Sequence, residues 1–522
     1  MKNNHWFILL LLLIILGVVL RLSFMFQNTP FAEPDNFMYY SAALHFGLLP
    51  YSSFPIHNTF SEGPGLWIMP VSIYFVTFGF FSILSIMEWL PVFFGIGGAV
   101  IAYLWIEKAL GDRKLALLGL VIALFIPAGL FRTMWGEYRG ESFVPLFVSL
   151  MALGFLYLKL NIEDKKTGGL IGRIAIVLFL LAVILYTVYL SIFMWNGGIY
   201  IIPIFILEAL GLILILFFKN LSVKNKFMIM VLAAAIGFII IVTHYYYLLE
   251  SSMLWISEAS PPTIGTFITY GGLPALFSFV FFGIFLFGFV YKSDLFHKQY
   301  NKYKDLMILI FPFVIVTFFL ASTIIRWEAL LAFPIAVMTA VTLAFLKPII
   351  SNRLYTIIYL LLFFSTILIG IMWSITIQHV PSLSQGYYKS LGWIDNNTDP
   401  NVTFLSIWQD GSGIEGWANR SSYTDSVFSM NTIKIEQYSA WLWANNRNET
   451  YICNVSPNYL FINTPLYTNS TAAIFQVINQ SAEPAANSNF NSLINSYNYS
   501  GLFFQVYNSD GIKIYKVGVC PR

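Results

Sequence analysis

The sequence predicts a polytopic α-helical membrane protein that ends in a small mixed α/β domain. Hydrophobic residues make up 58% of the chain, charged residues only 10%, and the mean hydropathy is +0.73. A soluble fold could not bury so much apolar surface. From about Gln378 onward, Asn, Ser, Thr and Tyr prevail, and alternating runs such as VTFLSI, NYLFI and GIKIYKV are typical of strands. We therefore expect a transmembrane domain over 1–376 and a soluble domain over 377–522.

Apolar segments of roughly 20 residues are long enough to cross a bilayer as helices. The first follows Lys2 without a small-residue cleavage site, which predicts a retained signal anchor. In all we expect about eleven crossings, near 6–26, 84–106, 115–131, 141–160, 170–189, 191–218, 227–249, 273–291, 306–323, 329–346 and 354–376.

The basic residues predict the orientation of these segments. Nearly all Lys and Arg fall in alternate loops, at 108–114, 159–173, 219–226, 292–304 and 347–353. Cytoplasmic loops are enriched in these residues, so the N-terminus is expected inside and the C-terminal domain outside a cell membrane. Because the basic residues are scattered and the net charge is only +3, we expect no nucleic-acid partner.

The first outer loop, 27–83, contains no Lys or Arg. Its second half, from residue 67 to residue 87, is apolar enough to imitate a crossing. Counting it as a crossing would move every later loop to the opposite side of the membrane, and the loops rich in Lys and Arg would then lie outside. We therefore expect a membrane-embedded or re-entrant element there.

The second outer loop, RTMWGEYRGE at 132–141, holds two arginines and two glutamates between two apolar segments. A helix-end anchor would explain arginine and tryptophan at a membrane edge. A charge cluster in this position is nevertheless costly, and such clusters are usually functional. The loop is therefore a candidate site.

Carboxylates occur in three outer loops: Glu33 and Asp35 in the first, Glu137 and Glu141 in the second, and Glu258 in the third, within 250–272. Converging carboxylates suit a hard divalent cation such as Mg²⁺ or Mn²⁺. Arg132 and Arg326, expected on the same face, suit a phosphate group because guanidinium offers a planar fork of donors. The combination indicates chemistry on a lipid-linked phosphate.

These motifs resemble the catalytic subunit of oligosaccharyltransferase, in particular its archaeal form with the GT-C fold. The matching segments are PDNFMYY around Asp35, RTMWGEYRGE around Arg132, MWNGGIYIIP at 194–203, ISEASPPTIGTF around Glu258 and IIRWEALLAFP around Arg326. Members of this family transfer a glycan from a polyprenyl (dolichyl) phosphate or diphosphate carrier to the amide of an Asn in an N-x-S/T sequon. The resemblance implies a single-subunit, metal-dependent, inverting glycosyltransferase whose partners are a lipid-linked oligosaccharide and an acceptor polypeptide.

The resemblance also implies roles for individual residues. Asp35 and Glu258 would be catalytic and would accept hydrogen bonds from the acceptor amide. A divalent metal, Mn²⁺ or Mg²⁺, would be bound by Asp35, Glu141 and Glu258, with Glu137 as a further candidate. Arg132 and Arg326 would bind the carrier phosphate.

Two positions depart from the family pattern. The segment 406–426 aligns with the acceptor-binding segment of the family, but its WWDYG motif reads Ile407-Trp408-Gln409-Asp410-Gly411. We expect Trp408, Gln409 and Asp410 to contact the acceptor sequon. In the second loop, Arg139 stands in place of a metal-binding aspartate, which weakens metal binding unless Glu137 or Glu33 compensates.

The departures leave two further hypotheses. One is a related polyprenyl-phosphate-dependent GT-C glycosyltransferase with another acceptor, which the altered WWDYG segment favours. The other is a catalytically silent paralogue that binds lipid-linked glycan, which Arg139 and Gln409 favour. A transporter is disfavoured, because ionisable residues within the predicted crossings, such as Glu208 and His244, are isolated.

The C-terminal domain contains eight N-x-S/T sequons. Possible glycosylation sites are Asn396, Asn401, Asn448 and Asn469. Cys453 and Cys520, the two cysteines of the chain, both lie in this domain, and a disulfide between them is possible if the domain is outside the cell.

Overall fold

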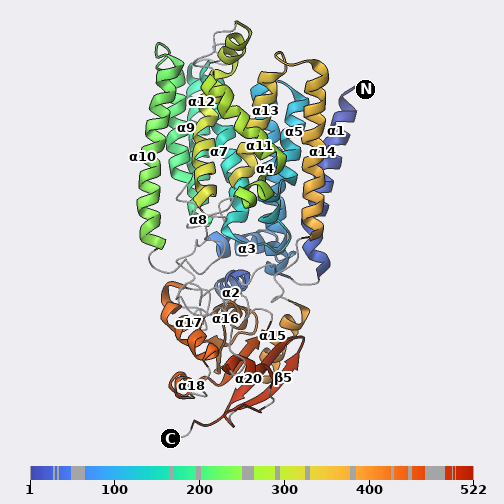
Figure 1. Ribbon diagram of the computed structural model, residues 1–522, viewed down its shortest axis with the longest axis vertical. Helices are drawn as coiled ribbons and strands as arrows, with labels where there is room; N and C mark the ends of the chain where they lie inside the picture. Colours follow the sequence, from blue (N-terminus) through green and yellow to red (C-terminus); the bar gives the residue numbers. More distant parts are fainter. Residues whose placement is uncertain are drawn as a thin grey trace.

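The computed structural model describes residues 2–27, 30–31, 35–48, 65–163, 170–194, 201–249, 264–287, 294–323, 330–376, 384–424, 428–444, 449–464, 488–495, 498–499 and 501–520. These residues form a tall helical bundle that stands on a smaller domain with a β-sheet (Figure 1). The helices α2 and α3 lie between the two parts (Figure 1).

Each apolar segment predicted to cross the membrane overlaps one or two helices of the bundle. The bundle helices are α1 Lys2–Arg21, α4 Ile83–Leu110, α5 Arg113–Phe125, α6 Pro127–Phe131, α7 Gly140–Glu163, α8 Leu170–Met194, α9 Ile201–Leu216, α10 Val223–Leu249, α11 Ile264–Phe287, α12 Asp294–Thr323, α13 Ala332–Leu346 and α14 Asn352–Thr376, with the 3-10 helix η1 Leu22–Gln27 after α1. Among the described residues, four helices are long and apolar enough to cross a membrane by themselves, and a fifth crossing results if the bent pair Asp294–Phe311 and Val314–Ala321 is one span. The number of crossings stays a prediction.

The centre of the bundle consists of α5 and α13. Every residue of α13 from Ala332 to Phe345 is buried, and so is every residue of α5 from Leu115 to Phe125. In contrast, only 17% of the apolar window of α14 is buried, and α14 lies at the edge of the bundle beside α1 (Figure 1). A helix that is apolar on all sides is stable in the middle of a bundle or against lipid.

Two loops with basic residues lie at the same end of the bundle. Asp112 caps the N-terminus of α5, where its side chain accepts hydrogen bonds from the backbone of Lys114 and Leu115. The Nζ atom of Lys347 lies 2.9 Å from the Asp112 carboxylate. The loops 108–114 and 347–353 are therefore neighbours, as expected of two loops on one side of a membrane.

The apolar stretch 67–87 is not one continuous element. Helix α3, Gly65–Val76, has only 12 residues and contains Pro70, which is too short for a full crossing. Phe78 and Gly79 have φ angles of 53° and 74°, which interrupt the helical conformation before α4 begins at Ile83. The predicted embedded element is thus a short helix followed by a turn, and its last residues belong to α4.

The C-terminal part contains the predicted mixed α/β structure. Its six-stranded sheet has the order β2-β1-β3-β6-β5-β4, in which β1 pairs in parallel with β2 and β3 while the other pairs are antiparallel. The strands are β1 Thr403–Leu405, β2 Ser421–Ser422, β3 Tyr459–Asn463, β4 Asn498–Tyr499, β5 Phe503–Ser509 and β6 Ile512–Val517, and the helices are α15 Gln385–Asn397, α16 Trp408–Gly416, α17 Phe428–Trp443, α18 Thr450–Val455 and α20 Asn489–Asn495. Strands β1, β3 and β6 fall on the three runs that the sequence predicted.

The two faces of the sheet have separate cores, because alternate side chains of a strand point to opposite faces. On one face, Ile512 and Ile514 belong to the same buried cluster as Phe37 of α2, Asp35–Leu48. On the other face, Tyr515 and Phe503 belong to a cluster with residues of α17 and α20. The first outer loop therefore contributes to the hydrophobic core of the C-terminal domain.

A disulfide joins Cys453 of α18 to Cys520, across a sequence separation of 67 residues. Removing it in a C453S/C520S variant is expected to destabilise the domain by about 2–5 kcal/mol, because a cross-link restricts the unfolded chain. Thermal unfolding checks this: a reductant should lower the melting temperature of the wild type and leave that of the variant unchanged. Equal melting temperatures for wild type and variant would contradict it.

Candidate functional site

The first and second outer loops meet at the start of α2. Asn36 is fully buried, and its Nδ2 atom donates a hydrogen bond to the carbonyl oxygen of Gly136 at 2.7 Å. Gly136 has a φ of +76°, and a Cβ atom there would lie 2.6 Å from the carbonyl oxygen of Pro30. Only glycine suits this position. The segment that begins with Asp35 thus lies directly against RTMWGEYRGE.

The predicted acceptor segment packs on the same helix from the other side. A Cβ atom at Gly416 of α16 would lie 2.2 Å from the carbonyl oxygen of Phe37. The Phe37 and Trp417 rings lie 6.0 Å apart, and those of Tyr40 and Trp417 lie 5.8 Å apart. Figure 1 shows α2 directly above α16. Helix α2 therefore connects two regions that the sequence predicted separately.

The charged residues of the second loop form buried ion pairs. Arg132 Nη1 lies 2.9 Å from Glu137 Oε1, and the two side chains are 5% and 1% exposed. Arg139 Nε lies 3.9 Å from Glu141 Oε2, with side chains 6% and 4% exposed. The guanidinium of Arg132 also lies 4.8 Å from the centre of the Phe131 ring. The loop is thus a buried charge cluster, which a helix-end anchor in the membrane surface would not require.

Asp410 is enclosed within the C-terminal domain. It is 1% exposed, and its Oδ1 atom accepts a hydrogen bond from Asn463 Nδ2 at 3.1 Å. A Cβ atom at the next residue, Gly411, would lie 1.8 Å from the carbonyl oxygen of Thr424. Trp408 and Gln409, in contrast, are partly exposed at the start of α16. Of the three residues expected to contact the acceptor, these two are accessible.

The burial of Asp410 predicts a pH dependence. Burial raises the pKa of Asp410 well above its usual value, and the hydrogen bond from Asn463 offsets this in part. The folded chain therefore retains the proton longer than the unfolded chain, so this group stabilises the fold most below the ordinary Asp pKa of about 3.9 and less as the pH rises. We expect the melting temperature of the wild type to fall between about pH 4 and 7 because of this group, and we expect D410N to lack this fall. The exposed-carboxylate control D399N should follow the wild type, and parallel curves for D410N and wild type would contradict the expectation.

Several predicted site residues lie outside the described residues. These are Glu33, Glu258 and Arg326, the side chain of Asp35, and the sequons at Asn448 and Asn469. Asn396 and Asn401 are described, and both are exposed. The structure thus brings together the first loop, the second loop and α16, while residues 250–263 of the third loop lie outside the described residues.

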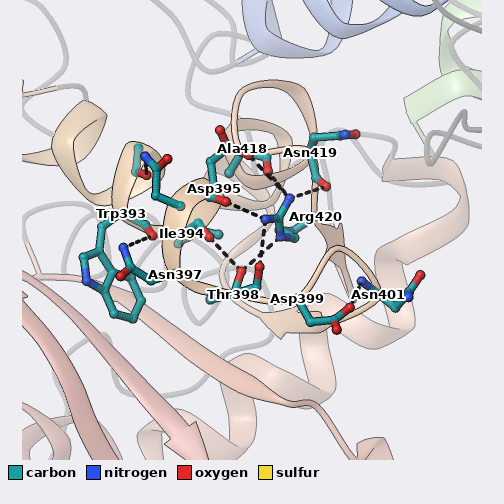
Figure 2. Close-up of polar contacts among 12 residues, drawn as sticks. Trp393, Ile394, Asp395, Asn397, Thr398, Asp399, Asn401, Ala418, Asn419 and Arg420 are labelled. Carbon is teal, nitrogen blue, oxygen red and sulfur yellow. Dashed lines mark hydrogen bonds and ion pairs between the residues drawn. The ribbon is translucent and has the colours of Figure 1, made fainter.

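Arg420 fixes the region around Thr398, which is the hydroxyl residue of the Asn396 sequon (Figure 2). The Arg420 guanidinium donates to the Asp395 and Thr398 carbonyl oxygens at 2.7 and 2.9 Å, to those of Ala418 and Asn419, and to Thr398 Oγ1 at 3.0 Å. Thr398 Oγ1 itself donates to the Ile394 carbonyl oxygen at 2.7 Å. In the folded domain, the hydroxyl group of the Asn396 sequon is therefore already engaged.

Glu88 of α4 is a carboxylate that sequence reasoning missed. Its carbonyl oxygen accepts a hydrogen bond from the Gly136 backbone nitrogen at 3.0 Å. Burial raises the pKa of Tyr40 and of Tyr388, and the negative charge of Glu88 raises both further. The available signal was an acid within the outer end of a predicted crossing.

The described carboxylates do not form a divalent metal site by themselves. Within the described residues, no group of three His, Cys, Asp or Glu side chains could hold a metal ion. Glu137 and Glu141 each lie against an arginine, whose positive charge disfavours a cation nearby. Of the expected ligands, Asp35 and Glu258 have no described side chain.

Comparisons with known proteins identify the fold. No family model and no curated protein match the sequence. Among solved structures, the archaeal oligosaccharyltransferase AglB from Archaeoglobus fulgidus, in complex with an inhibitory peptide and a dolichol-phosphate, is similar at a TM-score of 0.68 and 15% identity, over 91% of this chain and 71% of that one. A complex of the same organism's enzyme with Zn and sulfate has a TM-score of 0.60 at 15% identity, over 89% and 69% of the two chains.

ArnT from Cupriavidus metallidurans is also similar, at a TM-score of 0.54 and 10% identity, over 99% of this chain and 98% of that one. Identities this low establish the fold alone. The chain therefore shares the fold of AglB and ArnT, as the sequence predicted.

Proposed function

We propose that the chain is a membrane oligosaccharyltransferase, which transfers a glycan from a polyprenyl (dolichyl) phosphate or diphosphate to the side-chain amide of Asn in an N-x-S/T sequon. The observation that carries this proposal is the position of α2. The helix begins at Asp35, contacts the second outer loop through Asn36 and Gly136, and packs against α16 through Phe37 and Gly416. A donor site and an acceptor site would meet at this helix. The similarity to AglB bound to a peptide and a dolichol-phosphate supports the same reading.

The proposed chemistry follows from the acceptor. An amide nitrogen is a poor nucleophile because its lone pair is delocalised into the carbonyl group. Asp35 and Glu258 would accept hydrogen bonds from its two N–H groups and free the lone pair. Such positioning lowers the activation barrier by several kcal/mol. The nitrogen–carbon bond forms as the carbon–oxygen bond to phosphate breaks, and the amide proton passes to a carboxylate. The configuration at the anomeric carbon of the sugar is inverted.

Arginines would stabilise the departing phosphate. Its negative charge grows as the bond to the sugar breaks, and fixed positive groups in a site without water stabilise this charge. Arg132 and Arg326 are the proposed groups. A divalent cation would add further positive charge beside the departing phosphate. Whether Mn²⁺ or Mg²⁺ takes part through Asp35, Glu141 and Glu258 is decided by assays with added metal and with a chelator.

The proposed topology has about eleven crossings, the N-terminus inside and residues 377–522 outside the cell membrane, as a single subunit. The disulfide between Cys453 and Cys520 supports the outer position, because disulfides persist in oxidising compartments. The neighbouring loops 108–114 and 347–353 support a shared inner side.

A second candidate is a related GT-C glycosyltransferase with a different acceptor. Gln409 in place of the acidic residue of the acceptor segment favours it, as does the similarity to ArnT over nearly the full length of both chains. A silent paralogue that only binds lipid-linked glycan is the third, and the buried pairing of Arg139 with Glu141 favours it.

An acceptor screen separates the three functions. The purified chain is incubated with a polyprenyl-linked glycan and with N-x-T, N-x-S or hydroxyl-bearing peptides that lack Asn. We expect glycopeptide from the first two. Product only on the hydroxyl peptides would establish the second candidate, and donor binding without any product would establish the third.

A further inference from the structure

Arg21, the last residue of α1, is fully buried although its guanidinium is always charged. Its Nη1 atom donates to the carbonyl oxygens of Gly17 and Leu124, both at 3.1 Å, and its Nε atom donates to Thr133 Oγ1 at 2.9 Å. Within the described residues, none of these three hydrogen bonds is to a carboxylate. Because a buried charge is costly unless its donors are used, these contacts fix the guanidinium in one place.

These contacts reach the second outer loop. Thr133 directly follows Arg132, and its Oγ1 atom also donates to the Gly129 carbonyl oxygen at 2.6 Å. The carbonyl oxygen of Arg21 accepts a hydrogen bond from the Trp135 backbone nitrogen at 2.9 Å. Arg21 therefore binds the loop at two points, through its side chain and through its backbone.

Helix α4 closes the remaining space around this junction. A Cβ atom at Gly95 would lie 2.5 Å from Thr133 Cβ and 2.9 Å from Arg21 Nε. Thr133 is itself fully buried. The side chains of Arg21 and Thr133 are thus confined between α1, α4 and the second loop, and a change in one requires a change in the other.

We propose that Arg21 is a positioning residue that holds Arg132 and Glu137 in the arrangement that binds the carrier phosphate. This inference rests on the proposed function. Arg21 acts through Thr133 and does not touch the substrate. A lysine keeps the charge but cannot reproduce the fork geometry with which guanidinium serves Leu124 and Thr133 together. In R21K the second outer loop would keep Arg132 and Glu137, but these side chains would no longer be held in place.

The test compares R21K, T133V and their double variant by steady-state kinetics of glycan transfer and by thermal unfolding. Loss of a charge-assisted hydrogen bond should raise the KM for the lipid-linked donor by about 10- to 100-fold, while the KM for the acceptor peptide stays unchanged. The double variant should be no worse than R21K, because the two single changes remove the same contact. R113K is the matched control, because Arg113 forms an exposed pair with Glu107, and it should leave all values unchanged.

An unchanged donor KM in both single variants, or an equal rise in both KM values, would overturn the inference. T133V keeps the test open if R21K does not fold. If the wild type transfers glycan to no acceptor, the proposed function fails, and binding of labelled polyprenyl phosphate then replaces the kinetics. Weaker binding by R21K and T133V would still support Arg21, and wild-type binding by both, or no binding by the wild type, would overturn it.

Discussion

Replacing Asp35 with Asn is expected to lower the rate of glycan transfer by about 10²- to 10³-fold, the usual effect of removing one group that stabilises a transition state. Asp35 begins α2, and the next residue, Asn36, is fixed to the second loop. An amide at position 35 has nearly the same shape and would leave this contact in place. The variant loses the negatively charged oxygen that would accept a hydrogen bond from the N–H group of the acceptor Asn.

The expected signature of D35N is a fall in kcat with an unchanged melting temperature. Transfer to an N-x-T peptide and thermal unfolding are the measurements, and D399N, which changes an exposed carboxylate, is the matched control. Glu258→Gln should behave like D35N, because both residues are assigned to the same amide. D35N activity equal to that of the control would show that Asp35 is not catalytic.

Replacing Arg132 with Gln is expected to destabilise the chain by about 3–5 kcal/mol, because it leaves Glu137 as a buried charge without this partner. The Arg132–Glu137 pair is 2.9 Å long and almost fully buried. R132Q should also abolish most of the transfer, since Arg132 is assigned to the carrier phosphate. The two effects need separate measurements.

The double variant R132Q/E137Q separates them. Neutralising both partners removes the buried charge that R132Q leaves on Glu137, so much of the stability should return, while transfer and binding of polyprenyl phosphate should not. The exposed pair of Arg113 and Glu107 provides the control R113Q/E107Q, which should change neither quantity. Recovery of transfer in R132Q/E137Q would show that Arg132 has only a structural role.

Most of the fold could be predicted because it depends on local patterns. Apolar segments of membrane length and alternating strand residues are visible in short windows of sequence, and the helices and the strands β1, β3 and β6 coincide with them. The stretch 67–87 was more difficult, because its apolar composition continues through the turn at Phe78 and Gly79. Backbone conformation, not hydropathy, ends α3.

The candidate site could be predicted only in part, because its contacts join distant residues. The hydrogen bond from Asn36 to Gly136 spans 100 residues and that from Asn463 to Asp410 spans 53. The aligned motifs indicated that the first and second outer loops meet, but they did not indicate the contact between Asn463 and Asp410. The burial of Asp410 was therefore not predicted. Nor could spacing alone show that Arg139 and Glu141 lie against each other inside the protein.

The most direct test of the proposed function is transfer of glycan from a polyprenyl-linked donor to a peptide with one N-x-T sequon, beside the same peptide with Gln in place of Asn. Mass spectrometry should locate the glycan on the Asn of the first peptide and find the second unmodified. Equal modification of both peptides, or no product with a donor that the protein binds, would contradict the assignment as an asparagine oligosaccharyltransferase.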